Sequence, residues 1–266
     1  MFNIVVCMKV VIDPETPFSA FRIDKENRRP VPPSGVPPVF GPFDENALES
    51  ALRIKDEREC KVTILSLGKT LPKAVLQRAL AAGADEAIAI EDPRFENLDP
   101  FSTAGILAGA IRKAGKCDLV FAGRQAADWD AGLVWAGIAE FLDVPCITVA
   151  QKAEVQNGKV VVERCVSDGI EILESELPAL VTFSSEAGVL RNITLPALIK
   201  AKRQEILRWS ASDVGFEQMN PVELKELSMP TLGVIDQYMV QGENFQEKGR
   251  NLARKLMEDG ILKPSE

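Results

Sequence analysis

Between residues 3 and 149, short apolar runs alternate with stretches in which apolar residues recur every three or four positions. Residues 4–11 are apolar except for one lysine, which predicts a strand buried on both faces. Residues 44–55 carry an apolar stripe, which predicts a helix. The same patterns predict strands at 62–67, 86–90, 118–122 and 146–149 and helices at 71–82, 101–114 and 132–142. This alternation predicts a parallel sheet with right-handed crossovers.

A different pattern follows residue 150. Residues 151–156 and 159–165 flank Asn157-Gly158, a dipeptide typical of tight hairpin turns. Residues 170–175 and 180–183 continue as strands, and we expect an antiparallel extension beside the parallel sheet. The predicted fold is therefore α/β, with an open, doubly wound, mostly parallel sheet, an antiparallel hairpin extension and a C-terminal arm.

The composition turns polar and charged after about residue 203. Residues 210–230 predict an extended or partly helical arm, and residues 245–257 predict an amphipathic helix that docks on this chain or on a partner. We therefore divide the chain into an α/β domain with its extension, residues 1–203, and a C-terminal arm and helix, residues 204–266. One long proline-rich connection, residues 12–42, is expected to be a functional loop with a short hairpin arm at 18–23; the alternative is a mobile surface loop.

The chain has 266 residues, 46% hydrophobic and 26% charged, which suits one large or two small domains with a sizeable core. It contains no histidine, so histidine-based triads, dyads and metal sites are excluded. A net charge of -8 disfavours general nucleic-acid binding. No apolar run approaches the roughly 18 residues of a membrane span, and no signal peptide is evident. Five scattered cysteines without a C-x-x-C motif predict a reducing cytoplasm.

A ligand of such a sheet is expected in the loops after the strands, at residues 9–14, 66–69 and 123–132. Gly123 permits a tight turn, and Asp128 or Asp130 would cap the following helix. The amides at the helix start would then be free to bind a phosphate, with Arg124 adding charge. The alternative is an ordinary capped helix. Neither G-x-G-x-x-G after the first strand nor a Walker A motif occurs.

A second segment suggests docking. Thr194 would cap a short helix with Pro196 in its first turn. An apolar knob followed by basic residues would form either an ordinary surface helix or a docking patch for an acidic partner. The knob is formed by Leu195, Leu198 and Ile199, and the basic residues are Lys200, Lys202 and Arg203.

Ordered motifs across most of the chain resemble the beta subunit of electron-transfer flavoproteins, including their electron-bifurcating relatives. They are V-V-C-M-K-V-V-I-D (5–13), G-P-F-D-E-N-A-L-E (41–49), A-x-x-A-G-A-D-E-A (79–87), G-R-Q-A-A-D-W-D (123–130), D-G-I-E (168–171), L-P-A-L-V-T (177–182) and T-L-P-A-L-I-K-A-K (194–202). The resemblance implies a Rossmann-like, adenine-nucleotide-binding domain. It also implies an alpha-subunit partner that carries most of an FAD, AMP or a second FAD in this chain, and electron transfer between acyl-CoA dehydrogenase-type partners and an acceptor.

The resemblance also implies specific residues. The nucleotide site would comprise Cys7, Lys9, Gly41, Pro42, Phe43, Asp44, Ser66, Leu67, Gly123, Arg124, Gln125, Ala126, Ala127, Asp128, Trp129, Asp130, Ala131, Gly132, Leu133 and Val134. The segment that recognises the dehydrogenase would comprise Thr194, Leu195, Pro196, Leu198, Ile199, Lys200 and Lys202, with Leu195 inserting into the partner. The C-terminal arm and helix would dock on the partner subunit.

The chain departs from the family pattern at several positions. Gly41 stands where many members have asparagine, and Ala131 and Leu133 stand where many have threonine and glutamine. The N-x-P-R-Y motif appears only as Val189-Leu190-Arg191-Asn192. Phosphate binding would therefore rest on backbone amides. Two alternatives stay open: a stand-alone ATP-binding module without a redox role, and a structural partner with a vacant pocket.

Overall fold

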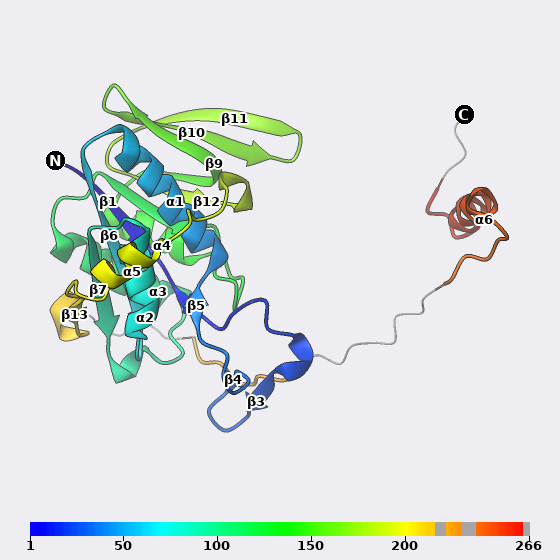
Figure 1. Ribbon diagram of the computed structural model, residues 1–266, viewed down its shortest axis with the longest axis horizontal. Coiled ribbons are helices and arrows are strands. Elements are labelled where there is room, and N and C mark those ends of the chain that lie inside the picture. Colours follow the sequence, from blue (N-terminus) through cyan, green and yellow to red (C-terminus); the bar gives the residue numbers. More distant parts are fainter. Residues whose placement is uncertain (216–221, 230–237, 263–266) are drawn as a thin grey trace. The chain divides into compact units, whose positions relative to one another are not determined.

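The computed structural model describes residues 1–215, 222–229 and 238–262 (Figure 1). The chain forms two compact units, Met1–Leu227 and Ser228–Glu266. The helices are α1 (Pro42–Glu57), α2 (Lys73–Ala82), α3 (Pro100–Ala114), α4 (Val134–Leu142), α5 (Leu195–Ala201) and α6 (Phe245–Glu258). Short 3₁₀ turns lie at Phe18–Ala20, Pro93–Phe95, Ser185–Ala187 and Ser212–Val214. Among the described residues, no helix has both the length and the apolar character to cross a membrane.

A nine-stranded sheet of order β11-β10-β9-β12-β8-β1-β6-β7-β13 forms the centre of the first unit. In this spatial order, each strand from β9 through β12, β8, β1, β6 and β7 to β13 runs parallel to the next. At the other edge, β10 pairs antiparallel with both β9 and β11. The strands are β1 (Phe2–Cys7), β6 (Cys60–Gly68), β7 (Glu86–Glu91), β8 (Leu119–Gly123), β9 (Cys146–Gln156), β10 (Lys159–Val166), β11 (Gly169–Glu176), β12 (Ala179–Phe183) and β13 (Leu207–Trp209). The predicted mostly parallel α/β fold is confirmed.

Both faces of the sheet are buried, because alternate side chains of each central strand enter different cores. In β1, Ile4 and Val6 pack in the core that contains residues of α1, α2 and α5. Val5 and Cys7 pack in the core that contains residues of α3 and α4. Continuous apolar runs are typical of strands covered on both sides, and two helical layers make the sheet doubly wound.

The first predicted strand, residues 4–11, is wrong beyond Cys7. The chain leaves the sheet there, and β2 (Val10–Val11) pairs antiparallel with β5 (Val39–Phe40) instead. The main chain at Lys9 bonds to the start of α1 rather than to a neighbouring strand: its N–H donates to a carboxylate of α1, and its carbonyl accepts from Gly41 at 3.0 Å. An apolar run therefore continued past the strand it predicted.

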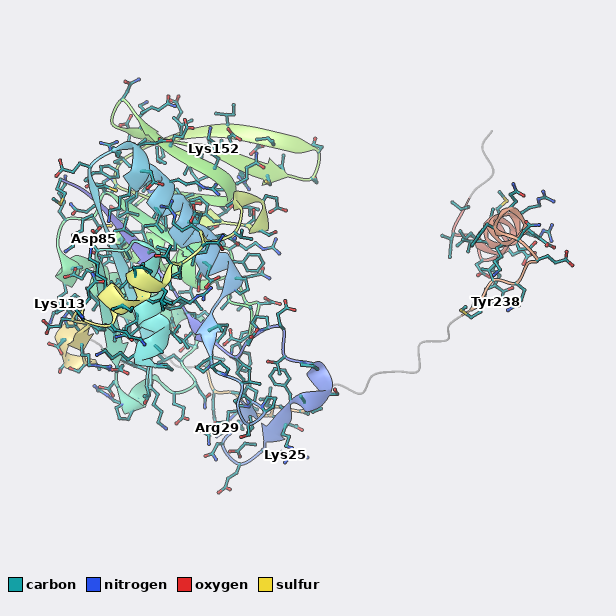
Figure 2. All side chains as sticks on the ribbon, in the orientation of Figure 1. Lys25, Arg29, Asp85, Lys113, Lys152 and Tyr238 are labelled. Carbon is teal, nitrogen blue, oxygen red and sulfur yellow. The ribbon has the colours of Figure 1, made fainter. Side chains whose placement is uncertain are left out.

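The predicted antiparallel extension contains only part of the expected residues. The strands predicted at 146–149 and 151–156 are one strand, β9, with left-handed Val149 (φ 60°) where its register with β12 shifts. Lys152, labelled in Figure 2, lies on β9, the strand that joins the parallel sheet to the antiparallel strand β10. The prediction for 180–183 is wrong in direction, because β12 inserts parallel between β8 and β9. All five of its residues are buried, as a central strand requires.

The remaining segments also differ in detail. The hairpin of the proline-rich connection joins β3 (Arg22–Asp24) to β4 (Arg29–Val31), not residues 18–23. β13 adds a parallel edge strand beside β7, so the first compact unit continues past residue 203. Of the predicted arm at 210–230, residues 216–221 and 230 lie outside the described residues. The predicted amphipathic helix is confirmed as α6, whose described residues include none that is buried.

Candidate functional site

Strand order reverses beside β1. The strands β6 and β7 lie on one side of β1, whereas β8, which follows them in sequence, lies on the other. Ligands of open parallel sheets bind beyond the carboxyl ends of the strands at such a reversal. The end of β1 at Cys7 and the end of β8 at Gly123 therefore mark the candidate site.

Asp44, in the first turn of α1, joins these two strand ends. Its Oδ2 accepts a hydrogen bond from the main-chain N–H of Lys9 at 2.7 Å, and its Oδ1 accepts one from the main-chain N–H of Gly123 at 3.0 Å. The N–H of Gly41 donates to the carbonyl of Lys9 at 3.0 Å. Three segments predicted for the site, around residues 7–9, 41–44 and 123, thus meet at one point.

The carboxyl of Asp44 is 6% exposed, and burial raises its pKa to about 7. The N–H groups of Lys9 and Gly123 and the charge of Lys9 oppose this rise in pKa, whereas the charge of Asp128 adds to it. Burial, and then the charge of Asp44, raise the pKa of the Cys7 thiol. Cys7 therefore stays protonated and is no nucleophile.

Gly123 is required by the close approach of α1. A Cβ at this position would lie 2.5 Å from Asp44 Oδ1 and 2.7 Å from Phe43 Cβ, distances that real Cβ atoms do not adopt. These distances agree with the prediction that a side chain at position 123 would block the turn. The absence of a side chain lets the N–H of Gly123 reach the carboxylate of Asp44.

The loop after β8 is held by Lys9, which follows β1, and by polar groups of the loop itself. Lys9 Nζ pairs with Asp128 Oδ2 at 2.7 Å. Gln125 Nε2 donates to Asp130 Oδ1 at 2.9 Å, and the N–H of Asp130 donates to the carbonyl of Ala126 at 2.9 Å. Asp130 adopts a left-handed conformation (φ 50°), which an aspartate tolerates better than most residues.

The predicted caps of the next helix are wrong. Helix α4 begins at Val134, and its N-cap, Leu133, has no side-chain capping bond. Asp128 and Asp130 lie too early in the chain, and their carboxylates bond to Lys9 and Gln125 instead. The first amides of α4 therefore have no side-chain acceptor within the described chain, which suits them to an external anion.

Two buried polar atoms at the site have no hydrogen-bond partner among the described residues. Ser66 Oγ, at the end of β6, belongs to a residue with 0% exposure. Arg124 Nε is buried while the guanidinium carbon lies 4.6 Å from the ring centroid of Phe43. Buried polar atoms without partners are rare in folded proteins, and a nucleotide offers suitable acceptors. The chemistry of these two groups is compatible with a polar, anionic ligand such as a nucleotide.

The residues predicted for this site differ in exposure. Those that are half-buried are Lys9, Phe43, Leu67, Arg124, Gln125, Ala126, Ala127, Gly132 and Val134. Those that are exposed are Pro42, Asp128, Trp129, Asp130, Ala131 and Leu133.

The predicted docking segment forms α5. Thr194 caps the helix, its Oγ1 accepting from the N–H of Ala197 at 3.4 Å. Leu195 is 70% exposed and Ile199 49%. Leu198 does not belong to this exposed knob, because it faces inward and packs against the core. Pro196, Lys200 and Lys202 are exposed.

A family model described as "Electron transfer flavoprotein domain" matches residues 34–214. The chain belongs to the electron transfer flavoprotein beta subunit family. It is 36% identical to electron transfer flavoprotein subunit beta of Clostridium acetobutylicum, over 98% of this chain and 100% of that relative. It is 39% identical to the Thermoanaerobacterium thermosaccharolyticum subunit, over 96% of this chain and 97% of the relative. It is 34% identical to the caffeyl-CoA reductase–Etf complex subunit CarD of Acetobacterium woodii, over 98% of this chain and 100% of that relative.

Membership in the electron transfer flavoprotein family implies an alpha-subunit partner, flavoprotein partners and a flavin-containing complex. It also disfavours the stand-alone ATP-binding module. Which nucleotide this beta subunit holds, and in which residues, stays a prediction.

Two surface grooves of the flavoprotein subunit lie away from the 123–134 loop. One, of about 500 Å³, is lined by Leu195, Pro196, Ile199, Lys200, Arg203 and Gln204. The other, of about 450 Å³, lies between the proline-rich connection and the starts of α1 and α2. Its lining includes the carboxyl-bearing residues Asp13, Glu15 and Glu45.

Sequence patterns did not predict one set of functional contacts. Asn46, Glu49 and Arg53 of α1 bond to the segment that leads into α5. Asn46 and Glu49 are polar residues at buried positions of a helix. In the sequence, only the three- and four-residue spacing of Asn46, Glu49 and Arg53 indicates that they share one face of the helix. The neighbouring apolar stripe gives no sign that this polar face is buried.

Proposed function

We propose that this subunit binds an adenine nucleotide, either AMP or a second FAD, where the strand order reverses. In the heterodimer with an alpha subunit that carries most of an FAD, it would pass electrons between acyl-CoA dehydrogenase-type partners and an acceptor. The observation that carries this proposal is the bridge from Asp44 to the N–H groups of Lys9 and Gly123. Two further observations support it: α4 starts without a side-chain cap, and Ser66 Oγ and Arg124 Nε have no hydrogen-bond partner among the described residues.

The roles of the residues follow from their chemistry. The amides at the start of α4 and the charge of Arg124 would bind a phosphate, while Ser66 Oγ would bond to a polar atom of the nucleoside. Asp44 would act by holding the two strand ends together, because its buried side chain accepts the N–H groups of Lys9 and Gly123. FAD, when bound, supplies reversible electron transfer. The chain itself contains no histidine and needs no acid–base step.

The choice between AMP and a second FAD concerns the space beside residues 9–14. The groove of about 450 Å³ borders this loop at Asp13 and Pro14 and falls within the usual range for small-molecule sites. Arg78 also lines the groove and pairs with Glu45 at 3.4 Å. The charges of Asp13 and Glu15 remain and disfavour phosphate, so the groove suits an uncharged part of a larger ligand. This groove supports the second FAD as the candidate that would use it; AMP would not need it.

Nucleotide analysis of the purified heterodimer tests the proposal. The complex is denatured, and the released nucleotides are separated and quantified by mass spectrometry and absorbance. We expect either one AMP and one FAD or two FAD for each heterodimer. A complex that releases one FAD and no other nucleotide would contradict the proposed site in this chain and favour a structural partner with a vacant pocket.

The docking partner is proposed from two observations. Leu195 and Ile199 are exposed apolar side chains beside the basic residues Lys200 and Lys202. One relative is named as a subunit of a caffeyl-CoA reductase complex. Both support an acyl-CoA-oxidising or acyl-CoA-reducing flavoenzyme with an acidic rim around an apolar pocket.

The C-terminal region, residues 204–266, is proposed to dock on the alpha subunit. Phe245 is 92% exposed, and Leu252 and Met257 of α6 are also exposed. An amphipathic helix without buried residues gains its stability by covering its apolar side. The proposed compartment is the cytoplasm, in keeping with five free cysteines.

A further inference from the structure

We propose that Arg191 is a positioning residue that fixes the docking segment on α1 in the orientation needed to recognise the dehydrogenase. This inference rests on the docking function proposed above. Arg191 does not belong to the exposed face of α5, so it would act through the main chain that leads to Leu195.

Arg191 makes two paired contacts with carboxylates of α1. Its Nε and Nη2 donate to the two oxygens of Glu49 at 3.0 and 3.2 Å. Its Nη1 and Nη2 donate to the two oxygens of Asp56 at 3.2 and 2.8 Å. Two-pronged contacts of this kind fix the guanidinium plane as well as its position. The side chain of Glu49 is 8% exposed, so the inner contact is shielded from water.

The main chain near Arg191 is fixed by the same helix. The N–H of Arg191 donates to Glu49 Oε2 at 2.9 Å. Arg53 Nη1 donates to the carbonyl of Ala187 at 2.8 Å, and Asn46 Nδ2 donates to the carbonyl of Gly188. Positions 46, 49, 53 and 56 lie on one side of α1, because they are spaced by three and four residues. One face of α1 thus holds residues 187–191 by both side chain and main chain.

The far end of the docking segment is held by α2. Ala201 is 1% exposed, and Gln77 Nε2 donates to the carbonyl of Lys202 at 3.3 Å. With both ends fixed, the exposed Leu195 has few orientations to lose when it binds. A docking residue that is ordered in advance binds with a smaller entropic cost. Release of the Arg191 end would restore this cost without altering any group that touches the partner.

The test uses the purified heterodimer as electron acceptor for an acyl-CoA dehydrogenase that reduces the wild type. Arg191→Gln should raise the KM for the heterodimer about tenfold, with kcat and released nucleotides unchanged. Arg191→Lys keeps the charge but loses the paired geometry, and should give an intermediate KM. Trypsin should cleave Arg191→Gln faster than the wild type at the sites that both proteins contain, after Lys200, Lys202 and Arg203.

Arg29→Gln is the matched control. Arg29, labelled in Figure 2, also pairs with two carboxylates, Asp24 and Glu96, but lies in the hairpin of the proline-rich connection. The KM of the dehydrogenase for the Arg29→Gln heterodimer should equal its KM for the wild-type heterodimer. If Arg191→Gln yields no folded heterodimer, Asp56→Asn decides, since it removes only the outer carboxylate, and a smaller rise in KM is expected.

The outcomes separate the inference from the docking function. If Leu195→Ala raises the KM while Arg191→Gln, or Asp56→Asn in its place, leaves it unchanged, the positioning role is wrong and the docking role stands. If Leu195→Ala also leaves the KM unchanged, the docking function itself is wrong. If Arg191→Gln forms the heterodimer but releases less nucleotide than the wild type, Arg191 serves the fold as a whole and the inference is overturned.

Discussion

At the scale of single residues, Asp44 and Gly123 form a matched pair. The carboxylate of Asp44 takes the N–H of Gly123, and the missing side chain of Gly123 makes room for that carboxylate. The pair uses the amides of Lys9 and Gly123 internally, so neither is free for a phosphate. The proposed anion site would therefore use later amides of the same loop, at the start of α4.

The raised pKa of Asp44 predicts a pH-dependent stability. Its carboxyl has a pKa of about 7 when folded and about 4 when unfolded, so the folded protein retains a proton that the unfolded chain releases. The free energy of unfolding contributed by this group therefore falls as pH rises from about 4 to about 7, by at most ~1.4 kcal/mol per pH unit.

Asp44→Asn removes this titration. The free energy of unfolding of the variant minus that of the wild type should increase as pH rises from about 5 to about 7, and should level off above about 7. Urea midpoints of both heterodimers across this range measure it. Glu45→Gln, which removes a half-buried carboxyl of the same helix, is the control. A constant difference for Asp44→Asn would show that its carboxyl is ionised throughout.

At the scale of elements, α1 serves two regions. Its first turn holds the strand ends through Asp44, and its later turns hold the segment before α5 through Glu49 and Arg53. The helix α5 is short, and its stability comes from the Thr194 cap and from burial of Ala201. What α5 offers a partner is therefore a small, firmly held apolar surface.

Leu195→Ala tests this surface. The leucine is 70% exposed, so the folded chain should keep its stability within about 0.5 kcal/mol. Electron transfer with the dehydrogenase should show a KM at least about tenfold higher, because an anchor residue in an interface carries much of its affinity. Ile172→Ala, another exposed aliphatic residue on β11, should leave the KM unchanged. Equal effects of the two substitutions would contradict a specific docking role for α5.

At the scale of the whole molecule, the chain has two units of different kinds. Met1–Leu227 contains both apolar cores, whereas α6 of the second unit has no buried residue among those described. A unit without its own core depends on another surface. We propose that the alpha subunit provides that surface.

Truncation after Leu227 tests this dependence. The shortened chain should keep the far-ultraviolet circular dichroism of the α/β unit, because the nine-stranded sheet and its covering helices α1–α5 are retained. Its recovery with a tagged alpha subunit should fall several-fold. Phe245→Ser in the full-length chain should weaken recovery in the same direction. Undiminished recovery of the truncated chain would contradict docking of residues 228–266 on the alpha subunit.

The sequence by itself determined the α/β class, the order of most elements and the family, because apolar periodicity and ordered motifs are local properties of the chain. It also singled out Gly123 and Leu195. It did not predict where β1 ends, that β12 lies at the centre of the sheet, or which groups meet Asp128 and Asp130. Those outcomes depend on contacts between residues far apart in sequence, such as Lys9 with Asp44 and Arg191 with Glu49. Only the tertiary structure decides them, since hydrogen-bond partners are fixed by which elements pack together.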